Sequence, residues 1–179
     1  AEAELLEPNA MTLATVDEHG APCQRTVLLK YFDADGFVFF TNYGSRKAQQ
    51  LATNQRVSIL FPWLPLQRQV EISGTASQVS KAETLKYFLS RPRGSQLGAW
   101  VSQQSQVITS RSVLEMKMDE LKRKYRDGQV PLPSFWGGYR IEPSRFEFWQ
   151  GRPNRLHDRI CYLPEERNQG GWQSLRLSP

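Results

Sequence analysis

The segment from Thr41 to Lys47 combines a glycine turn, a helix start and two adjacent cations. Gly44 follows an expected strand, and Ser45 is placed to cap a helix whose first residues are Arg46 and Lys47. Two positive charges at the positive end of a helix dipole cost a few tenths to about 1 kcal/mol each unless an anion lies there. The free N–H groups of the first turn can donate to the same anion. The pattern indicates a phosphate site, with a solvated pair of cations as the alternative.

Two further cations flank a short apolar stretch, with Arg25 before it and Lys30 after it. On a regular strand, residues five apart point to opposite faces. Both side chains can contact one ligand only if the strand contains a bulge or if the ligand wraps around the end of the strand. On this segment alone, the favoured alternative is a pair of charges that protects a buried strand from aggregation.

A third group lies near the end of a predicted helix at 80–90. Tyr87 and Arg91 are four residues apart and share one helix face, and Ser95 follows shortly after. An arginine, a hydroxyl and an aromatic ring at a helix end can hold a phosphate ester. Taken singly, Arg91 is more often a cation that offsets the negative end of the helix dipole.

A fourth group follows Trp149, where Arg155, His157 and Arg159 alternate. In an extended segment these three side chains project to one side. Three potential cations on one face repel one another unless water screens them or an anion lies between them. Trp149 adds a flat apolar wall for a ring. The alternative is a solvated edge strand protected by its charges.

The elements that must position these residues are mostly strands. Alternating and β-branched patterns predict strands at 11–16, 24–32, 37–41, 57–61, 69–79, 138–141, 145–150, 159–163 and 172–177. Helices are predicted at 45–53, at 80–90 behind a capping box of Ser80 and Glu83, and at 111–126 behind Ser110. Pro62 and Pro65 favour an edge or a loop. Many short strands with a few helices favour a small β-barrel with flanking helices.

Composition narrows the ligand class. The 179 residues are 39% apolar and 23% charged, which fits one domain, and no apolar run approaches the roughly 20 residues of a membrane span. The two cysteines and two histidines have no metal-ligand spacing, so neither a metal site nor a disulfide is expected. The lack of an expected disulfide favours a protein of the reducing cytoplasm. The net charge is +5 and most of the basic residues are arginine, which favours small anionic ligands.

Taken together, these motifs resemble the pyridoxamine (pyridoxine) 5′-phosphate oxidase family, the flavoenzymes that make pyridoxal 5′-phosphate. The matching segments run from about Asn9 to Pro179 and include 25–30, 40–42, 44–47, 68–70, 90–92, 95–102, 104–105, 134–138, 147–151 and 155–159. The resemblance implies a mainly β, FMN-binding split barrel in one domain over 1–179, and a homodimer with FMN between the subunits. It also implies that an N-terminal extension, which can help to cover the active site, is missing from this chain.

The resemblance further implies specific site residues. FMN would be held by Arg25, Lys30, Thr41, Arg46, Lys47, Gln69, Gln104, Ser105, Trp149 and Arg159. The substrate would be held by Lys30, Tyr87, Arg91, Ser95, Arg155 and His157. Arg155 and His157 would lie nearest the reacting carbon as catalytic residues.

The implied reaction is the FMN-dependent oxidation of pyridoxamine and pyridoxine 5′-phosphates by O2, in vitamin B6 biosynthesis and salvage. The products would be pyridoxal 5′-phosphate and hydrogen peroxide, with ammonia from the amine. One alternative is an oxidase of the same fold that acts on another ring system, as in phenazine biosynthesis, against which Tyr87, Arg91 and Ser95 argue. Another is a flavin-binding member without activity.

A binding protein for single-stranded nucleic acid, suggested by the positive charge and the aromatic residues, is the alternative from a different class. It ranks low because the chain has no basic run and no repeat that interleaves aromatic and basic residues. We therefore expect a cytoplasmic enzyme that binds neither nucleic acid nor a membrane.

Overall fold

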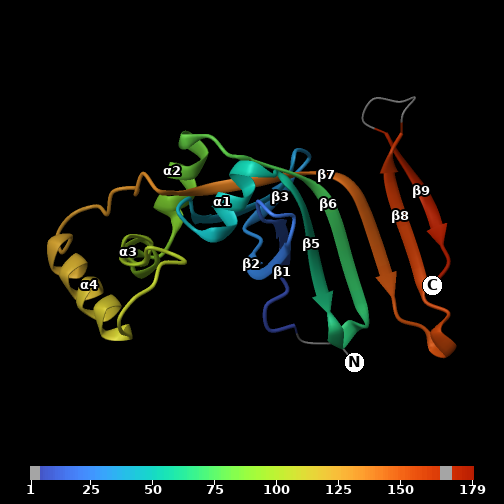
Figure 1. The fold of residues 1–179 in the computed structure, drawn as a ribbon, viewed down its shortest axis with the longest axis horizontal. Helices are drawn as coiled ribbons and strands as arrows, with labels where there is room; N and C mark the ends of the chain where they lie inside the picture. The colour runs from blue at the N-terminus through green and yellow to red at the C-terminus, as the bar shows by residue number, and fades with distance from the viewer. Residues whose placement is uncertain (1–4, 166–170) are drawn as a thin grey trace.

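The computed structural model describes residues 5–165 and 171–179, which form a curled antiparallel sheet flanked by helices (Figure 1). The strands pair in the order β2-β1-β5-β6-β7-β4-β3, and β8 and β9 continue from β7. Their bounds are β1 Ala10–Val16, β2 Pro22–Leu28, β3 Tyr31–Asp33, β4 Gly36–Asn42, β5 Arg56–Trp63, β6 Arg68–Gln78, β7 Trp136–Gln150, β8 Asp158–Pro164 and β9 Trp172–Leu177. The predicted mainly β architecture with flanking helices is confirmed.

Four α-helices and two short 3-10 helices accompany the described strands. They are α1 Arg46–Thr53, α2 Lys81–Ser90, α3 Arg93–Val101 and α4 Arg111–Lys124, with η1 Leu64–Leu66 and η2 Pro153–Arg155. Three of the α-helices were predicted, and the Ser80 hydroxyl accepts the Glu83 N–H at 3.1 Å as the capping pattern requires. The sequence reading missed α3 because Gly94 and Gly98 lower its helix propensity. Within the described residues, no helix is long and apolar enough to cross a membrane.

Two strand predictions need correction. The stretch 24–32 is two strands, because Leu29 and Lys30 leave β2 and the Lys30 N–H turns to the Val38 carbonyl. The predicted strands 138–141 and 145–150 are one strand, β7, whose pairing with β6 shifts register between Ser73 and Gly74, where Ser144 of β7 is the extra residue. A Cβ at Gly74 would lie 2.2 Å from the Glu142 carbonyl oxygen, so only glycine permits this close passage.

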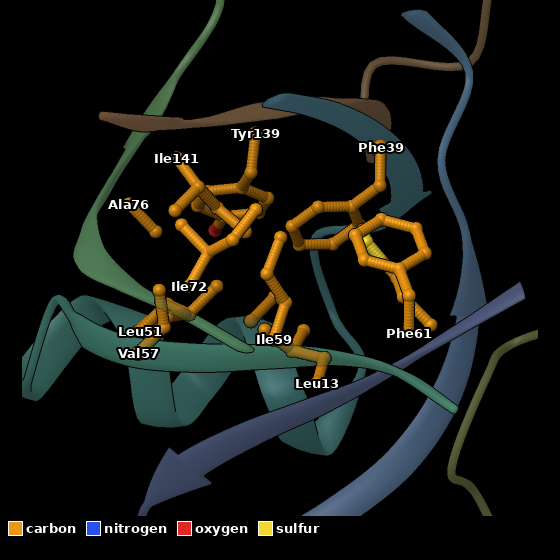
Figure 2. Packing of buried hydrophobic residues seen from close by; sticks show 12 residues of the cluster. Leu13, Phe39, Leu51, Val57, Ile59, Phe61, Ile72, Ala76, Tyr139 and Ile141 are labelled. Carbon is orange, nitrogen blue, oxygen red and sulfur yellow. The ribbon is translucent and has the colours of Figure 1, made fainter. Parts of the chain in front are cut away.

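The main core fills the concave side of the sheet (Figure 2). Alternate residues of neighbouring strands, such as Leu13, Phe39, Ile59 and Ile141, are fully buried there. Leu51 of α1 joins them, so α1 is held against the sheet by its apolar face. Burying each such side chain stabilises the fold by about 1.5–3 kcal/mol. This packing fixes where the N-terminus of α1, with its two cations, lies.

A second core joins α2, α3 and α4 around Trp136, the first residue of β7. Phe88, Leu97 and Leu121 come from the three helices and are buried there. The apolar stripe of the predicted 111–126 helix, which also includes Leu114, Met118 and Tyr125, packs against the same cluster. Figure 1 shows α3 and α4 at one end of the molecule and the β8–β9 hairpin at the other, with β7 running between them.

Candidate functional site

The predicted phosphate segment forms a cationic cluster, defined here as Arg25, Thr41, Arg46, Lys47, Gln104 and Ser105. Lys47 is only 8% exposed, and its Nζ donates to Thr41 Oγ1 at 3.1 Å and to Gln104 Oε1 at 2.9 Å. Thr41 Oγ1 in turn donates to Gln104 Oε1 at 2.9 Å. Residues 104–105 are thereby brought to α1 from a segment about 60 positions away in the chain.

The buried Lys47 ammonium has neutral partners. Among the described residues, no ion pair joins Arg25, Arg46 or Lys47 to a carboxylate. Burial, and then the nearby Arg25, lower the pKa of Lys47 from 10.5 to about 8. Buried charges in proteins are normally paired, so the buried Lys47 and the half-buried Arg25, which form no ion pair among the described residues, make a site suited to an anion.

Arg25 is oriented by residues that sequence reasoning did not identify. Its guanidinium donates to Thr15 Oγ1 at 2.5 Å and to Gln50 Oε1 at 3.0 Å, and the same Gln50 oxygen accepts from Thr15 at 2.6 Å. Thr15 and Gln50 belong to β1 and α1, and no local motif marks either residue. Lys30 is exposed and follows the end of β2, so the parity of a single regular strand, assumed in the prediction, does not relate it to Arg25.

The start of α1 differs in one detail from the predicted cap. Ser45 has the extended backbone of an N-cap, but its side chain makes no capping hydrogen bond and its Oγ is buried without a partner among the described residues. The Arg46 N–H donates instead to Ser105 Oγ at 3.2 Å. Ser105 has a φ of 73°, a backbone conformation that non-glycine residues rarely adopt outside functional sites.

The second group, called the α2 group, consists of Tyr87, Arg91 and Ser95. The Tyr87 ring stacks on Phe40 with centroids 4.0 Å apart, and the Arg91 guanidinium lies 4.6 Å from the Trp136 ring centre. Burial raises the pKa of Tyr87 and lowers that of Arg91. Arg91 Nη1 is buried with no hydrogen-bond partner within the described chain, which indicates a missing acceptor.

The structure supports the predicted proximity of Tyr87 and Arg91, since both contact Trp136. Ser95 lies exposed in the first turn of α3, where its N–H bonds to the Pro92 carbonyl at 2.8 Å. The Gln96 amide donates to the Phe88 and Arg91 carbonyls, both at 3.1 Å, and so ties α3 to the end of α2. Sequence reasoning missed the platform of Phe40 and Trp136, although both lie in segments that carried the resemblance.

The third group, called the β7-end group, contains Gln69, Trp149, Arg155, His157 and Arg159. Gln69 of β6, Trp149 of β7 and Arg159 of β8 are direct register neighbours, so they form one row across three strands. The Arg159 Nε donates to Glu147 Oε1 at 2.7 Å, and this bond is the main cause of the lowered pKa of Glu147. Arg159 therefore has a carboxylate partner, unlike Arg25, Arg46 and Lys47 of the cationic cluster.

The predicted single face of Arg155, His157 and Arg159 is wrong. Arg155 lies in η2 with a φ of 63° and is exposed, because Pro153 and a left-handed Asn154 turn the chain before β8 begins. His157 packs against Trp149 with ring centroids 4.8 Å apart, and its Nδ1 accepts the Arg152 N–H at 3.1 Å. A neutral His157 therefore carries its proton on Nε2 and can donate from that atom.

One chain does not bring the three groups together. Thr41 pairs with Gly137 near the start of β7, whereas Trp149 lies near its end, roughly 40 Å of strand away at about 3.3 Å per residue. Figure 1 shows α1 away from the β8–β9 hairpin, beside which β7 ends. A site that uses all three groups would need more than one copy of the chain.

Comparisons with known families match both parts of the chain. Residues 1–125 match the model described as pyridoxamine 5′-phosphate oxidase, and residues 136–179 match the pyridoxine 5′-phosphate oxidase C-terminal dimerisation region. A pyridoxine/pyridoxamine 5′-phosphate oxidase of Crocosphaera subtropica is 66% identical over 178 residues, which are 99% of this chain and 83% of the relative. The enzyme of the same name from Aliarcobacter butzleri is 60% identical over the same shares.

Solved structures agree on the fold. PhzG from Burkholderia lata, solved with tetrahydrophenazine-1-carboxylic acid, is similar with a TM-score of 0.89 and 30% identity over 97% of this chain and 83% of PhzG. A pyridoxamine 5′-phosphate oxidase-related, FMN binding protein of Nostoc punctiforme has a TM-score of 0.77 at 17% identity over 98% of this chain and 90% of its own. The split-barrel fold is thus shared, and the matched family models and the close relatives place this chain in the pyridoxine/pyridoxamine 5′-phosphate oxidase family of oxidoreductases.

Proposed function

We propose that this chain oxidises pyridoxamine 5′-phosphate and pyridoxine 5′-phosphate to pyridoxal 5′-phosphate with FMN as cofactor and O2 as electron acceptor. The observation that carries the proposal is that two separate cations, Lys47 and Arg91, form no ion pair with a carboxylate of the described chain, in a member of this family. Two phosphate esters, one on the cofactor and one on the substrate, match this pair of sites.

The cationic cluster fits the phosphate of FMN. The buried Lys47 ammonium and the guanidinium of Arg25 have only neutral partners, so an incoming dianion would be their first countercharge. Arg46 adds its charge at the helix start, and Thr41, Gln104 and Ser105 supply polar groups. Four further residues are the proposed contacts to the rest of the cofactor: Lys30, Gln69, Trp149 and Arg159.

The α2 group fits the phosphate of the substrate. Arg91 has a buried N–H without an acceptor, and the stacking of its guanidinium and of Tyr87 on aromatic rings fixes both side chains before a ligand arrives. Such preorganisation lets the binding energy of a remote phosphate align the reacting carbon. Ser95 and Lys30 complete the proposed set of residues that bind the substrate phosphate.

The distance between the groups supports a site shared by two copies. A homodimer would place the β7-end group of one copy beside the cationic cluster of its partner, so that each site draws on both chains. Residues 136–179, which carry every member of the β7-end group except Gln69, match the model named for dimerisation. Arg155 and His157 would then face the substrate from the second copy.

Bound FMN would supply the redox step, in which a hydride equivalent leaves C4′ of the substrate and O2 finally takes the two electrons as H2O2. The alcohol loses two hydrogens directly, whereas the amine gives an imine that water converts to the aldehyde and ammonia. The chain contributes binding and orientation. His157 Nε2 and the exposed Arg155 are the proposed donors near the reacting carbon.

Oxygen-uptake measurements test this function. We expect oxygen consumption that depends on FMN with both phosphates, one H2O2 per turnover, and ammonia from the amine alone. Pyridoxamine without its phosphate should react far more slowly, and tetrahydrophenazine-1-carboxylic acid should give no turnover. A protein that takes up FMN but consumes no oxygen would be a flavin-binding member without this activity. A protein that takes up no FMN would refute the proposal.

The affinity of the apoprotein for FMN should fall as the pH rises above about 8. Lys47 has a pKa of about 8, so a growing fraction is neutral at higher pH, and only the ammonium attracts the phosphate. At pH 9 the dissociation constant should be roughly tenfold higher than at pH 7, as measured by quenching of flavin fluorescence. Lys47→Arg stays charged and should remove most of this dependence. An equal pH dependence in both proteins would exclude Lys47 as its source.

A further inference from the structure

A network of four side chains attaches the first turn of α2 to the sheet. Arg140 of β7 bonds Asp33 of β3 through Nη1 and Glu83 of α2 through Nη2, the latter at 3.0 Å. The Tyr31 hydroxyl of β3 also donates to Glu83. The Arg140 side chain is 19% exposed, so these interactions are less screened by water than most surface pairs.

The network lies directly beside the proposed substrate site. Glu83 and Tyr87 are one helical turn apart on α2, so they share a face. Both line a cavity of about 500 Å³ together with Tyr31, Ser90 and Arg140. Tyr31 also contacts Phe40, the ring on which Tyr87 stacks.

The cavity beside Tyr87 carries negative charge next to a proposed site for an anion. Glu83 and Asp33 are two carboxylates at the wall of a cavity that adjoins the α2 group, where the proposed ligand is a phosphate dianion. Unmasked, they would repel that ligand, since like charges at a protein surface interact more strongly than in bulk water. Among the described residues, Arg140 is the cation that bonds both carboxylates.

We infer that Arg140 is a positioning residue that neutralises Glu83 and Asp33 and so keeps the cavity beside Tyr87 favourable for the substrate phosphate. The inference rests on the proposed function for the identity of the ligand. Arg140 acts through Glu83 and Tyr87 rather than on the reacting atoms.

Kinetics of the FMN-loaded enzyme provide the test. Arg140→Gln should raise KM for pyridoxamine 5′-phosphate roughly tenfold and leave kcat within about twofold, with unchanged affinity for FMN. Arg111→Gln removes an equal charge from an exposed pair on α4 and should change neither constant. The dissociation constant of pyridoxal 5′-phosphate, measured by calorimetry, should rise in parallel with KM.

Removing the carboxylate separates charge masking from a purely structural role. Glu83→Gln keeps the hydrogen-bond geometry and frees the charge of Arg140, so KM should stay equal or fall, and Arg140→Gln/Glu83→Gln should return KM to within about threefold of wild type. A raised KM in Glu83→Gln, or an equally raised KM in the single Arg140 variant and the double variant, would overturn the inference. If Arg140→Gln fails to fold, Glu83→Gln still decides. If the wild type lacks turnover, the proposed function fails, whereas calorimetry with pyridoxal 5′-phosphate still tests Arg140.

Discussion

Arg91→Ala is expected to raise KM for pyridoxamine 5′-phosphate about 100-fold while the enzyme keeps its FMN. The guanidinium is held over Trp136 with one N–H buried and without an acceptor, so a phosphate would complete an interaction for which the site is already arranged. Truncating one partner of a desolvated charge pair costs about 2–5 kcal/mol, and 100-fold is about 2.7 kcal/mol. Steady-state kinetics and flavin fluorescence measure the two effects separately.

Two variants control this result. Arg123→Ala removes a cation from the exposed last turn of α4 and should leave KM unchanged. Arg91→Lys keeps the charge but loses the planar group that stacks on Trp136, and should recover only part of the loss. Equal losses of substrate and FMN affinity in Arg91→Ala would contradict the division into two phosphate sites.

Mixed dimers of two inactive variants are expected to regain activity. Lys47→Ala damages the cationic cluster and Arg155→Ala damages the β7-end group, and each should lower kcat/KM more than about 100-fold by itself. If every site combines the two groups from different copies, a mixed dimer has one intact site and one doubly damaged site. Random mixing should therefore restore about a quarter of wild-type activity, measured after co-expression of differently tagged chains.

The matched control pairs two variants of the same group. Lys47→Ala with Arg46→Ala leaves every site with a damaged cationic cluster, so this mixture should recover nothing. Recovery in neither mixture, with dimers confirmed by light scattering, would show that each site is built from one chain. The separation along β7 would then need another explanation.

Local sequence patterns determine much of the secondary structure of this protein. The cap at Ser80, the cationic start of α1, the apolar stripe of α4 and most of the strands depend on residues within a few positions of each other, so the sequence alone predicts them. The segments that mark the family are also local, and for this reason they could be recognised before any fold was known. Where local rules conflicted with packing they failed. The two glycines of α3 concealed a helix that the second core stabilises, and the predicted gap between 138–141 and 145–150 lies inside one strand, where Ser144 is an extra residue in the pairing with β6.

Tertiary structure alone decided which residues meet. Gln104 reaches Lys47 across 57 positions and Arg140 reaches Glu83 across another 57, and neither contact has any trace in nearby spacing. The same holds for Gln50 and Thr15 around Arg25, and for Trp136 beneath Arg91. The predicted row of Arg155, His157 and Arg159 failed because a turn at Pro153 replaced the expected extended chain. Such contacts are set by strand register and by the burial of distant apolar faces, which fix the positions of polar side chains that the local sequence leaves free.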